Sequence, residues 1–289
     1  MKINGKTKIV GVFGAPVAHT ASPAMHNAAF AALKMNWVYL PFHVKIEHLA
    51  AALRGISAMG LVGVNLTVPH KVAALDLIDE VDPEARQLGA VNTIAVQGDR
   101  LVGYNTDGYG FVKAIQEEFD LSLEGKNVLV LGAGGAGRAI AIKCALEGAR
   151  KVLVANRSLG KAENLSGEVT GKMAGVLSAI PLTSDSIREV IGDVDLLVNA
   201  TSVGLREGES LELQPTLFSP HLCVYDTIYR PSETELLKDA YAGGAKCANG
   251  LSMLLHQGAR SFEIWTGDKM APVAKMREEL RTAVYGKIK

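Results

Sequence analysis

An apolar run, Asn127–Leu131, leads into Gly132-Ala133-Gly134-Gly135-Ala136-Gly137, and a helical pattern follows over residues 136–147. This order is typical of a dinucleotide-binding βαβ unit. The first glycine permits a tight turn, the second lets a pyrophosphate approach the backbone, and the third allows close packing of helix on strand. The helix N-terminus offers unpaired N–H groups to that anion. Because the glycines stand between a strand and a helix, the stretch predicts a nucleotide site rather than an ordinary glycine turn.

Short apolar strands alternate with helical patterns on both sides of this loop, which indicates parallel α/β layers. We expect strands at 9–13, 37–44, 63–68, 151–155, 195–198, 223–226 and 245–248, and a β-hairpin formed by 90–96 and 100–104. We expect helices at 22–33, 47–59, 250–265 and 273–284. Ser22 should cap the first of them, and the last should bury a stripe formed by Val273, Met276, Leu280 and Val284.

The motif order predicts an α/β fold with two domains separated by a cleft. An N-terminal α/β substrate domain would comprise residues 1–107 together with 251–289, because the two C-terminal helices are expected to return to it. A Rossmann-type, doubly wound dinucleotide-binding domain would comprise residues 108–250. A turn-rich stretch over residues 204–220 is expected to form a surface loop near the cofactor.

The composition indicates a globular enzyme. The chain is 48% hydrophobic and 21% charged, and thirty basic residues balance thirty acidic ones. A net charge of zero provides no field for nucleic acid or an anionic membrane, and no apolar run is long enough to span a bilayer. The N-terminus lacks a secretory signal, and the three scattered cysteines are typical of a reduced, cytoplasmic protein. A structural metal is not expected, since no Cys/His cluster is present.

The strand after the glycine loop indicates which dinucleotide binds. An NAD site normally places a carboxylate at the end of that strand, where it holds the ribose 2′-hydroxyl. Here the strand ends in Asn156, Arg157 and Ser158, without a carboxylate. A guanidinium can grip a phosphate with two N–H bonds, so a 2′-phosphate, and hence NADP rather than NAD, fits better. Lys161 would add a second positive charge; the alternative is that Arg157 is a solvated surface residue.

Two residues on the N-terminal side of the glycine loop are candidates for chemistry. Lys71 follows the apolar run 63–68 and is expected to close that strand, and Asp107 stands in Asn105-Thr106-Asp107-Gly108. Oxidation of an alcohol by hydride transfer requires a group that takes the hydroxyl proton, and a lysine oriented by a carboxylate can do so. Taken singly, the lysine could equally be a solvated surface charge, and the aspartate part of a turn or helix cap.

Several further motifs occur together along the chain. They are His19-Thr20-Ala21-Ser22-Pro23-Ala24-Met25-His26-Asn27, Asn65-Leu66-Thr67-Val68-Pro69-His70-Lys71, Ala90-Val91-Asn92-Thr93, Asn105–Gly108, the glycine loop, Asn156-Arg157, Asn199-Ala200-Thr201-Ser202, Asp226-Thr227-Ile228-Tyr229-Arg230-Pro231 and Asn249–Gln257. In this order, and over nearly the whole chain, they make the sequence resemble the shikimate dehydrogenase family.

The resemblance implies reversible oxidation of shikimate to 3-dehydroshikimate with NADP, the reductive direction serving aromatic amino-acid biosynthesis. Lys71 would be the general acid/base and Asp107 its hydrogen-bonded partner. Thr20 and Ser22, assisted by Tyr229, would hold the substrate carboxylate. The ring hydroxyls would be held by Asn65, Thr67, Asn92, Asp107 and Gln257. The cofactor site would comprise Gly132, Ala133, Gly134, Gly135, Ala136, Asn156, Arg157, Ser158, Lys161, Thr201, Thr227 and Gly250.

Two alternatives stay open beside this reading. The family usually has serine where this chain has Thr20, and the added methyl group stiffens the side chain and alters the space next to the carboxylate. A broader quinate/shikimate dehydrogenase is therefore a second candidate. A non-catalytic sensor of shikimate-like acids is a third, although Lys71 and Asp107 are both present. We expect a monomer or a homodimer that acts on a small molecule.

Overall fold

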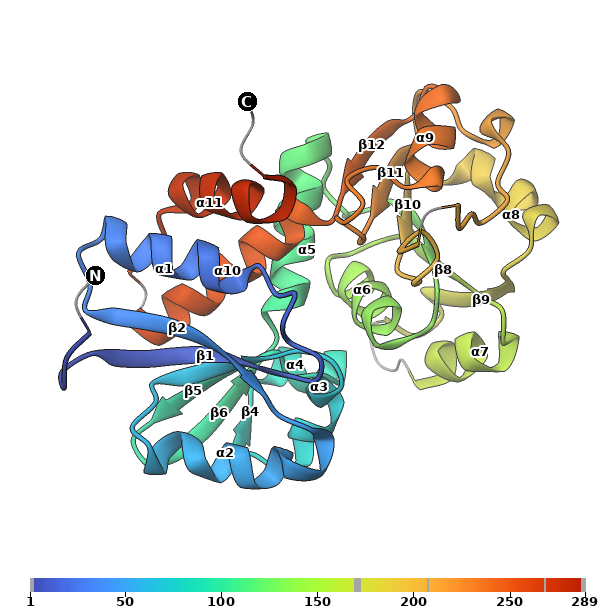
Figure 1. Ribbon diagram of the computed structural model, residues 1–289. Coiled ribbons are helices and arrows are strands. Elements are labelled where there is room, and N and C mark those ends of the chain that lie inside the picture. Colours follow the sequence, from blue (N-terminus) through green and yellow to red (C-terminus); the bar gives the residue numbers. More distant parts are fainter. Residues whose placement is uncertain (1–2, 169–172, 207, 268, 287–289) are drawn as a thin grey trace. The chain divides into compact units, whose positions relative to one another are not determined.

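A computed structural model describes residues 3–168, 173–206, 208–267 and 269–286. The chain forms two compact units (Figure 1). Unit 1 consists of Met1–Gly110 and Leu254–Lys289, and unit 2 consists of Phe111–Met253. The chain passes from one unit to the other inside two helices, α5 (Thr106–Phe119) and α10 (Leu251–Thr266).

Unit 1 is built on a six-stranded sheet with the order β2-β1-β3-β5-β6-β4. Strand β1 pairs in parallel with β2 and β3, whereas β5 is antiparallel to both β3 and β6. The predicted hairpin is confirmed as β5 and β6. The strands are β1 (Lys8–Gly14), β2 (Trp37–His43), β3 (Gly63–Leu66), β4 (Glu80–Val81), β5 (Thr93–Gln97) and β6 (Arg100–Tyr104).

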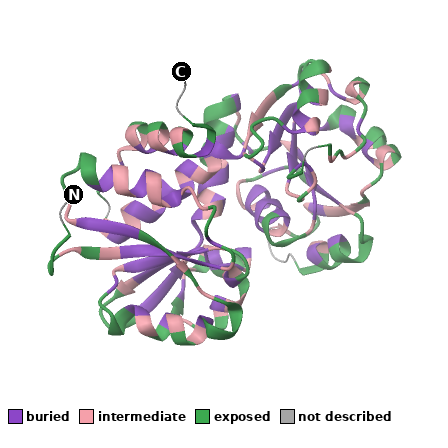
Figure 2. Cartoon of the chain, in the orientation of Figure 1, coloured by how far each residue is buried: buried purple, intermediate pink, exposed green. Residues whose placement is uncertain are grey.

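Helices cover both faces of this sheet, with α2 on one side and α1, α10 and α11 on the other (Figure 1). The helices of unit 1 are α1 (Ser22–Ala32), α2 (Leu49–Ala58), α3 (His70–Ala73), α4 (Pro83–Leu88) and α11 (Val273–Tyr285), with the C-terminal part of α10. The interior strands and the inner helix faces are buried (Figure 2). The predicted stripe on α11 is confirmed for Met276, Leu280 and Val284, which are buried, while Val273 is half-buried.

The predicted cap of α1 is wrong. Ser22 is the first residue of the helix, Ala21 occupies the N-cap position, and no side chain caps the helix there. Ser22 instead donates its own backbone N–H to Thr20 Oγ1 over 3.4 Å. A proline follows at once, and since proline lacks an N–H, it leaves one group fewer that needs a cap.

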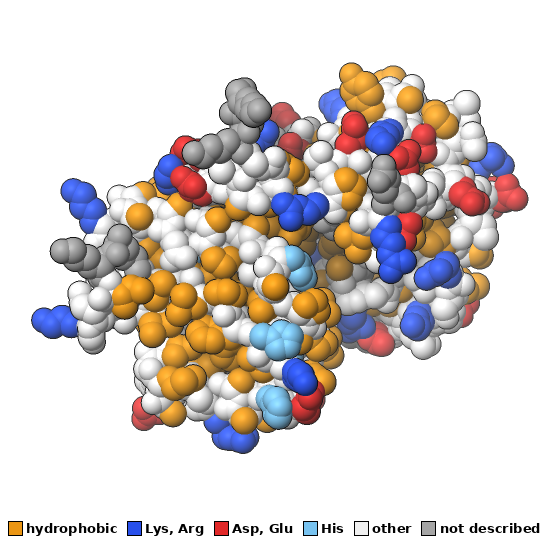
Figure 3. All heavy atoms as spheres, in the orientation of Figure 1, with side chains coloured by type: hydrophobic (Ala, Val, Ile, Leu, Met, Phe, Trp, Pro, Cys, Tyr) orange, Lys and Arg blue, Asp and Glu red, His pale blue; other side chains and the backbone are white. Residues whose placement is uncertain are grey.

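The outer edge of the unit 1 sheet is β2, and a side chain from α1 lies against it. Asn27 Oδ1 accepts from the backbone N–H of Tyr39 over 2.8 Å, and Asn27 Nδ2 donates to the carbonyl of Tyr39 over 3.0 Å. Two residues further along β2, Pro41 has no N–H to donate. Hydrophobic side chains gather on one face of unit 1 (Figure 3). Leu40 of β2 is 38% exposed.

Unit 2 has the Rossmann topology. Its six strands run in the order β12-β11-β10-β7-β8-β9, and every neighbouring pair is parallel. Counted from β7, this is the doubly wound order 3-2-1-4-5-6, so the prediction is confirmed. Strand β9 and helices α7 to α9 are additions to the elements expected from the sequence. The strands are β7 (Asn127–Leu131), β8 (Lys151–Asn156), β9 (Leu177–Pro181), β10 (Leu196–Asn199), β11 (Cys223–Asp226) and β12 (Lys246–Asn249), and the helices α6 (Gly135–Leu146), α7 (Leu159–Glu168), α8 (Ser184–Val190) and α9 (Glu235–Ala242).

Candidate active site

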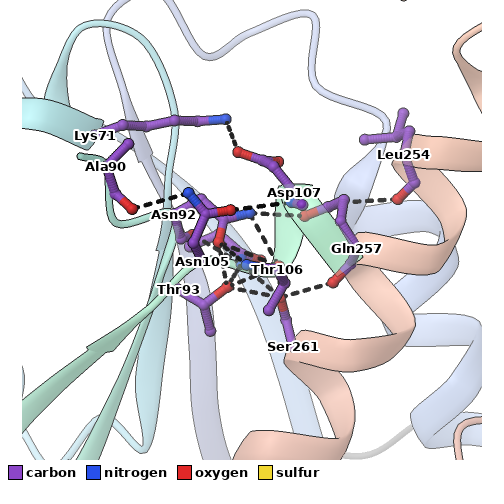
Figure 4. Close-up of polar contacts among 12 residues, drawn as sticks. Lys71, Ala90, Asn92, Thr93, Asn105, Thr106, Asp107, Leu254, Gln257 and Ser261 are labelled. Atoms are coloured by element: carbon purple, nitrogen blue, oxygen red, sulfur yellow. Dashed lines mark hydrogen bonds and ion pairs between the residues drawn. The ribbon is translucent and has the colours of Figure 1, made fainter. Parts of the chain in front are cut away.

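Lys71 and Asp107 form an ion pair in unit 1. Lys71 Nζ donates to Asp107 Oδ2 over 2.7 Å, with the two side chains 31% and 19% exposed (Figure 4). The prediction that Lys71 closes a strand is wrong. Strand β3 ends at Leu66, and Lys71 lies in the short helix α3. Asp107 lies in the first turn of α5, where the helix dipole favours a negative charge. Asn105 Oδ1 accepts from the Gly108 N–H over 3.1 Å, as the side chain of an N-cap does.

Asn92, just before β5, has its side chain oriented by α5 and α10. Its Oδ1 accepts from the Thr106 N–H over 2.7 Å. Its Nδ2 donates to Thr106 Oγ1 over 2.9 Å and to Gln257 Oε1 over 3.4 Å. Gln257 Nε2 in turn donates to the carbonyl of Leu254 over 2.8 Å. The structure therefore brings together two of the predicted hydroxyl-binding side chains, Asn92 and Gln257, which are 165 residues apart in sequence.

The side-chain amide of Asn65, in β3, makes hydrogen bonds through both its oxygen and its nitrogen. Its Oδ1 accepts from the Tyr39 hydroxyl over 2.8 Å. Its Nδ2 lies within hydrogen-bond distance of the Asn92 carbonyl, Thr93 Oγ1 and Ser261 Oγ, at 3.1, 2.9 and 3.0 Å. Burial raises the pKa of Tyr39, so its hydroxyl stays protonated and donates. Sequence reasoning missed Tyr39 and Ser261, which stand outside every quoted motif, and assigned no role to Thr106 although it stands in Asn105–Gly108.

The remaining predicted substrate residues lie in both units. Thr20 and Thr67 are half-buried and Ser22 is buried, all three in unit 1. The Thr67 methyl group packs so closely on Gly14 that a Cβ at position 14 would overlap it. Tyr229 belongs to unit 2, on the segment that follows β11.

His26 lies in the aromatic packing of unit 1. Its ring stacks on Tyr39 with centroids 4.3 Å apart, and Trp265 lies at 5.5 Å. The side chain is fully buried, and neither ring nitrogen has a hydrogen-bond partner among the described residues. Burial lowers the pKa of His26 to about 3, so the ring is neutral. Over the described part of the chain, no group of His, Cys, Asp and Glu is arranged to hold a metal ion.

The glycine loop of unit 2 borders a cavity of about 570 Å³. Gly132 has φ +104°, a conformation that side chains disfavour, and a Cβ at Gly137 would overlap the Gly132 carbonyl oxygen. Added Cβ atoms at Gly134 and Gly135 would meet nothing within 4 Å, so their backbone is open to a ligand. The loop residues that line the cavity are Gly132, Ala133 and Gly134, while Gly135 and Ala136 open helix α6.

The far end of the cavity is cationic. Arg157, Ser158 and Lys161 line it, and all three are exposed. Within the described residues no ion pair engages Arg157 or Lys161. Strand β8 ends at Asn156, whose Oδ1 accepts from the Ala133 N–H over 3.1 Å. Two unpaired cations and no carboxylate at the strand end fit the 2′-phosphate of NADP.

A further part of the lining comes from the segment between β10 and β11. Thr201 lines the cavity and donates its hydroxyl to Asn199 Oδ1 over 2.7 Å. Ser210, Leu211 and Glu212 also line it, so this part of the predicted loop over residues 204–220 lies beside the glycine loop. Within the same stretch Pro215–Leu217 form a short 3-10 helix, and residue 207 lies outside the described residues.

Gly250 and Thr227 meet closely after β12 and β11. A Cβ at Gly250 would overlap the Thr227 carbonyl oxygen. The Thr227 hydroxyl donates to the Asn199 carbonyl over 2.9 Å. Beside them, the fully buried Asp226 carboxylate accepts from Asn199 Nδ2, the Ile228 N–H and the Thr234 hydroxyl, at 3.0, 3.0 and 2.6 Å. Burial raises the pKa of Asp226, while these donors favour the charged form.

A Rossmann unit with a phosphate-compatible cation pair, and a second α/β unit with a lysine–carboxylate pair among oriented amides, define the class of two-domain nicotinamide-dependent oxidoreductases. Three family models match the chain. The shikimate dehydrogenase substrate-binding domain matches residues 12–94, shikimate/quinate 5-dehydrogenase matches 113–206, and the shikimate 5′-dehydrogenase C-terminal domain matches 250–281. The chain belongs to the shikimate dehydrogenase family.

Similar proteins match over nearly their full lengths. Shikimate dehydrogenase (NADP(+)) of Geobacter metallireducens is 45% identical over 281 residues, 97% of this chain and 98% of the relative. The structure of shikimate 5-dehydrogenase from Listeria monocytogenes in complex with shikimate and NAD has 36% identity and a TM-score of 0.91, covering 96% and 98%. That of shikimate 5-dehydrogenase from Thermus thermophilus with NADP(H) and shikimate has 40% identity and a TM-score of 0.85, covering 96% and 100%. No helix in the described part of the chain is long and apolar enough to span a membrane.

Proposed function

We propose that this chain is an NADP-dependent shikimate dehydrogenase that interconverts shikimate and 3-dehydroshikimate, the reductive direction serving aromatic amino-acid biosynthesis. The observation that carries the proposal is the 2.7 Å contact between Lys71 Nζ and Asp107 Oδ2, close to the amides of Asn92 and Gln257 (Figure 4). Membership of the family and the NADP-dependent relative from Geobacter metallireducens support the same activity.

Lys71 is the proposed group that moves the proton. During reduction, its ammonium donates a proton to the oxygen that becomes the ring hydroxyl, and during oxidation the amine takes that proton back. Asp107 holds the Lys71 Nζ in position and accepts from the same ring hydroxyl. When bound, the nicotinamide supplies the hydride exchange at the carbon.

The other proposed roles follow the chemistry of each side chain. Asn65, Thr67, Asn92 and Gln257 hold the ring hydroxyls, since amides and hydroxyls both donate and accept. Thr20, Ser22 and Tyr229 donate hydroxyl hydrogen bonds to the substrate carboxylate. The proposed cofactor residues are Gly132, Ala133, Gly134, Gly135, Ala136, Asn156, Arg157, Ser158, Lys161, Thr201, Thr227 and Gly250. The substrate domain would comprise residues 1–107 with 251–289, and the NADP domain residues 108–250.

The test is an absorbance assay at the nicotinamide band, with shikimate and quinate each offered with NADP and NAD. We expect the highest kcat/KM for shikimate with NADP. Turnover of quinate at a comparable kcat/KM would favour the second candidate, a broader quinate/shikimate dehydrogenase. Thr20 and the match to a shikimate/quinate family model favour that candidate. No turnover in any of the four combinations would overturn the proposed enzyme.

A cytoplasmic location and a monomeric or homodimeric state stay predictions. Sedimentation equilibrium of the purified chain measures the oligomeric state directly.

A further inference from the structure

The hydroxyl of Ser261 lies at the centre of the polar cluster in unit 1. Ser261 stands on α10, one helical turn after Gln257, and its side chain is fully buried. Its Oγ has four neighbours within hydrogen-bond distance (Figure 4). They are the Gln257 carbonyl at 3.0 Å, Asn65 Nδ2 at 3.0 Å, Thr93 Oγ1 at 2.8 Å and Thr106 Oγ1 at 3.1 Å.

The direction of these bonds follows from what each partner can do. A serine hydroxyl has one hydrogen and two lone pairs. The Gln257 carbonyl can only accept, so Ser261 donates its hydrogen there, and Asn65 Nδ2 can only donate, so Ser261 accepts from it. One lone pair is left, and the Thr93 and Thr106 hydroxyls lie within reach of it; each of them has a single hydrogen, which it can donate either to Ser261 or to Asn92 Oδ1. Every bond of the Ser261 hydroxyl is thus made inside the protein, and none is left for a substrate.

These bonds connect a helix to a sheet. Ser261 belongs to α10, whereas Asn65 lies in β3 and Thr93 begins β5. Asn92 Nδ2 and Gln257 Oε1 are 3.4 Å apart, the longest of the contacts that Asn92 makes. A shift of α10 by a few tenths of an ångström would break that contact first. The separation of Asn92 from Gln257 therefore depends on what fixes α10 against the strands.

We propose that Ser261 is a positioning residue that fixes α10 against β3 and β5, and so sets the spacing of Asn65, Asn92 and Gln257 for the ring hydroxyls of the substrate. The inference rests on the proposed function. Without the Ser261 hydroxyl, Asn65 Nδ2 and a threonine hydroxyl would each lose a partner in a site that water does not reach, and the side chains would rearrange to recover it.

The expected effect falls on substrate binding. Contacts to ring hydroxyls that do not react serve the ground state and the transition state alike, so loosening them raises KM with little change in kcat. Within the described contacts neither Lys71 nor Asp107 touches Ser261. Cofactor binding should also be unchanged, because the proposed cofactor residues all belong to unit 2.

The experiment compares Ser261→Ala with a matched control, Thr266→Ala, in steady-state kinetics with shikimate and NADP. The Thr266 hydroxyl makes the same kind of bond on the same helix, to the Phe262 carbonyl at 2.8 Å, but among the described contacts it has no partner on the strands. We expect Ser261→Ala to raise the shikimate KM roughly tenfold, with kcat and the NADP KM within about threefold. Thr266→Ala should leave all three constants within about twofold.

The outcomes separate this inference from the proposed function. If the unaltered chain does not oxidise shikimate, the proposed function fails. If it does, and Ser261→Ala keeps the shikimate KM within twofold, Ser261 has no positioning role even where the melting temperature falls. An equal rise in the NADP KM would also overturn the inference. Should Ser261→Ala not fold, Ser261→Cys replaces it, because a thiol is a weak donor and acceptor; an unchanged shikimate KM in that variant contradicts the proposal.

Discussion

The Lys71 ammonium is bound to the Asp107 carboxylate over 2.7 Å, although the two residues are 36 positions apart and each stands in the first turn of a different helix. Helix α3 begins at His70, a short loop after β3 ends at Leu66, and α5 begins at Thr106, just after β6 ends at Tyr104. The pair is therefore held by backbone that the sheet fixes on both sides. The hydrogen bond to Asp107 directs the Lys71 Nζ toward the carboxylate.

Replacing Lys71 with methionine keeps the aliphatic stem and removes the proton donor. We expect kcat to fall about 100-fold or more, with a smaller change in the shikimate KM, because general acid–base catalysis contributes about that much. Lys113→Met, an exposed lysine on α5, is the control. A kcat within tenfold of the unaltered chain would remove Lys71 from the chemical step.

Asp107→Asn keeps the shape of the side chain and removes its charge. An amide oxygen holds the lysine less strongly than a carboxylate, and the ring hydroxyl loses a charged acceptor. We expect kcat to fall and the shikimate KM to rise together, so kcat/KM falls by more than either constant alone. An effect on KM alone would show that Asp107 binds the substrate without orienting Lys71.

Arg157→Ala tests the choice of cofactor. Loss of the guanidinium should raise the NADP KM at least tenfold and leave the NAD KM nearly unchanged, because NAD has no 2′-phosphate. The matched control is Arg188→Ala, an exposed arginine of α8 paired with Asp185 at 2.7 Å. An equal rise in the KM of both cofactors would mean that Arg157 contacts the part of the cofactor that NAD and NADP share and does not bind the 2′-phosphate.

His26 makes stability depend on pH. Its pKa is about 3 in the folded chain against 6.5 when exposed. Below about pH 6.5 the His26 ring binds a proton in the unfolded chain but stays neutral in the folded chain. The free energy of unfolding therefore decreases as the pH falls below 6.5, and the full stability is present above that pH. His26→Phe keeps the stack on Tyr39. The fall in unfolding free energy between about pH 7 and pH 5 should then be smaller by about 2 kcal/mol, measured by urea denaturation. Equal falls in both proteins would contradict a neutral, buried His26.

The sequence was sufficient for the parts of the fold whose signals are local. Strands β7, β8 and β10 of unit 2 are mostly apolar runs, and the glycine loop lies between β7 and a helix. Strand β9 was missed because it is a half-exposed edge strand in which Leu177 alone is buried. The position of Lys71 was wrong because α3 has four residues, too few for any helical period to appear.

The candidate site was predictable where residues stand in motifs. Asn65, Asn92, Asp107 and Gln257 all do. The contacts of Ser261 and Tyr39 were not predictable, because their hydrogen-bond partners are distant in the sequence: Asn65 is 196 residues from Ser261. The hydrogen bonds of the Ser261 hydroxyl to β3 and β5 form only when the sheet and α10 are folded together.

The Asn27 side chain covers part of the β2 edge of the unit 1 sheet. Its side-chain amide makes with Tyr39 the two hydrogen bonds that a neighbouring strand would make, and Pro41 withholds the next donor on that edge. An extended peptide therefore finds no uninterrupted row of backbone groups beside β2, even though apolar side chains such as Leu40 surround it. One amide from α1 thus occupies the Tyr39 backbone groups with which another strand would pair on this edge.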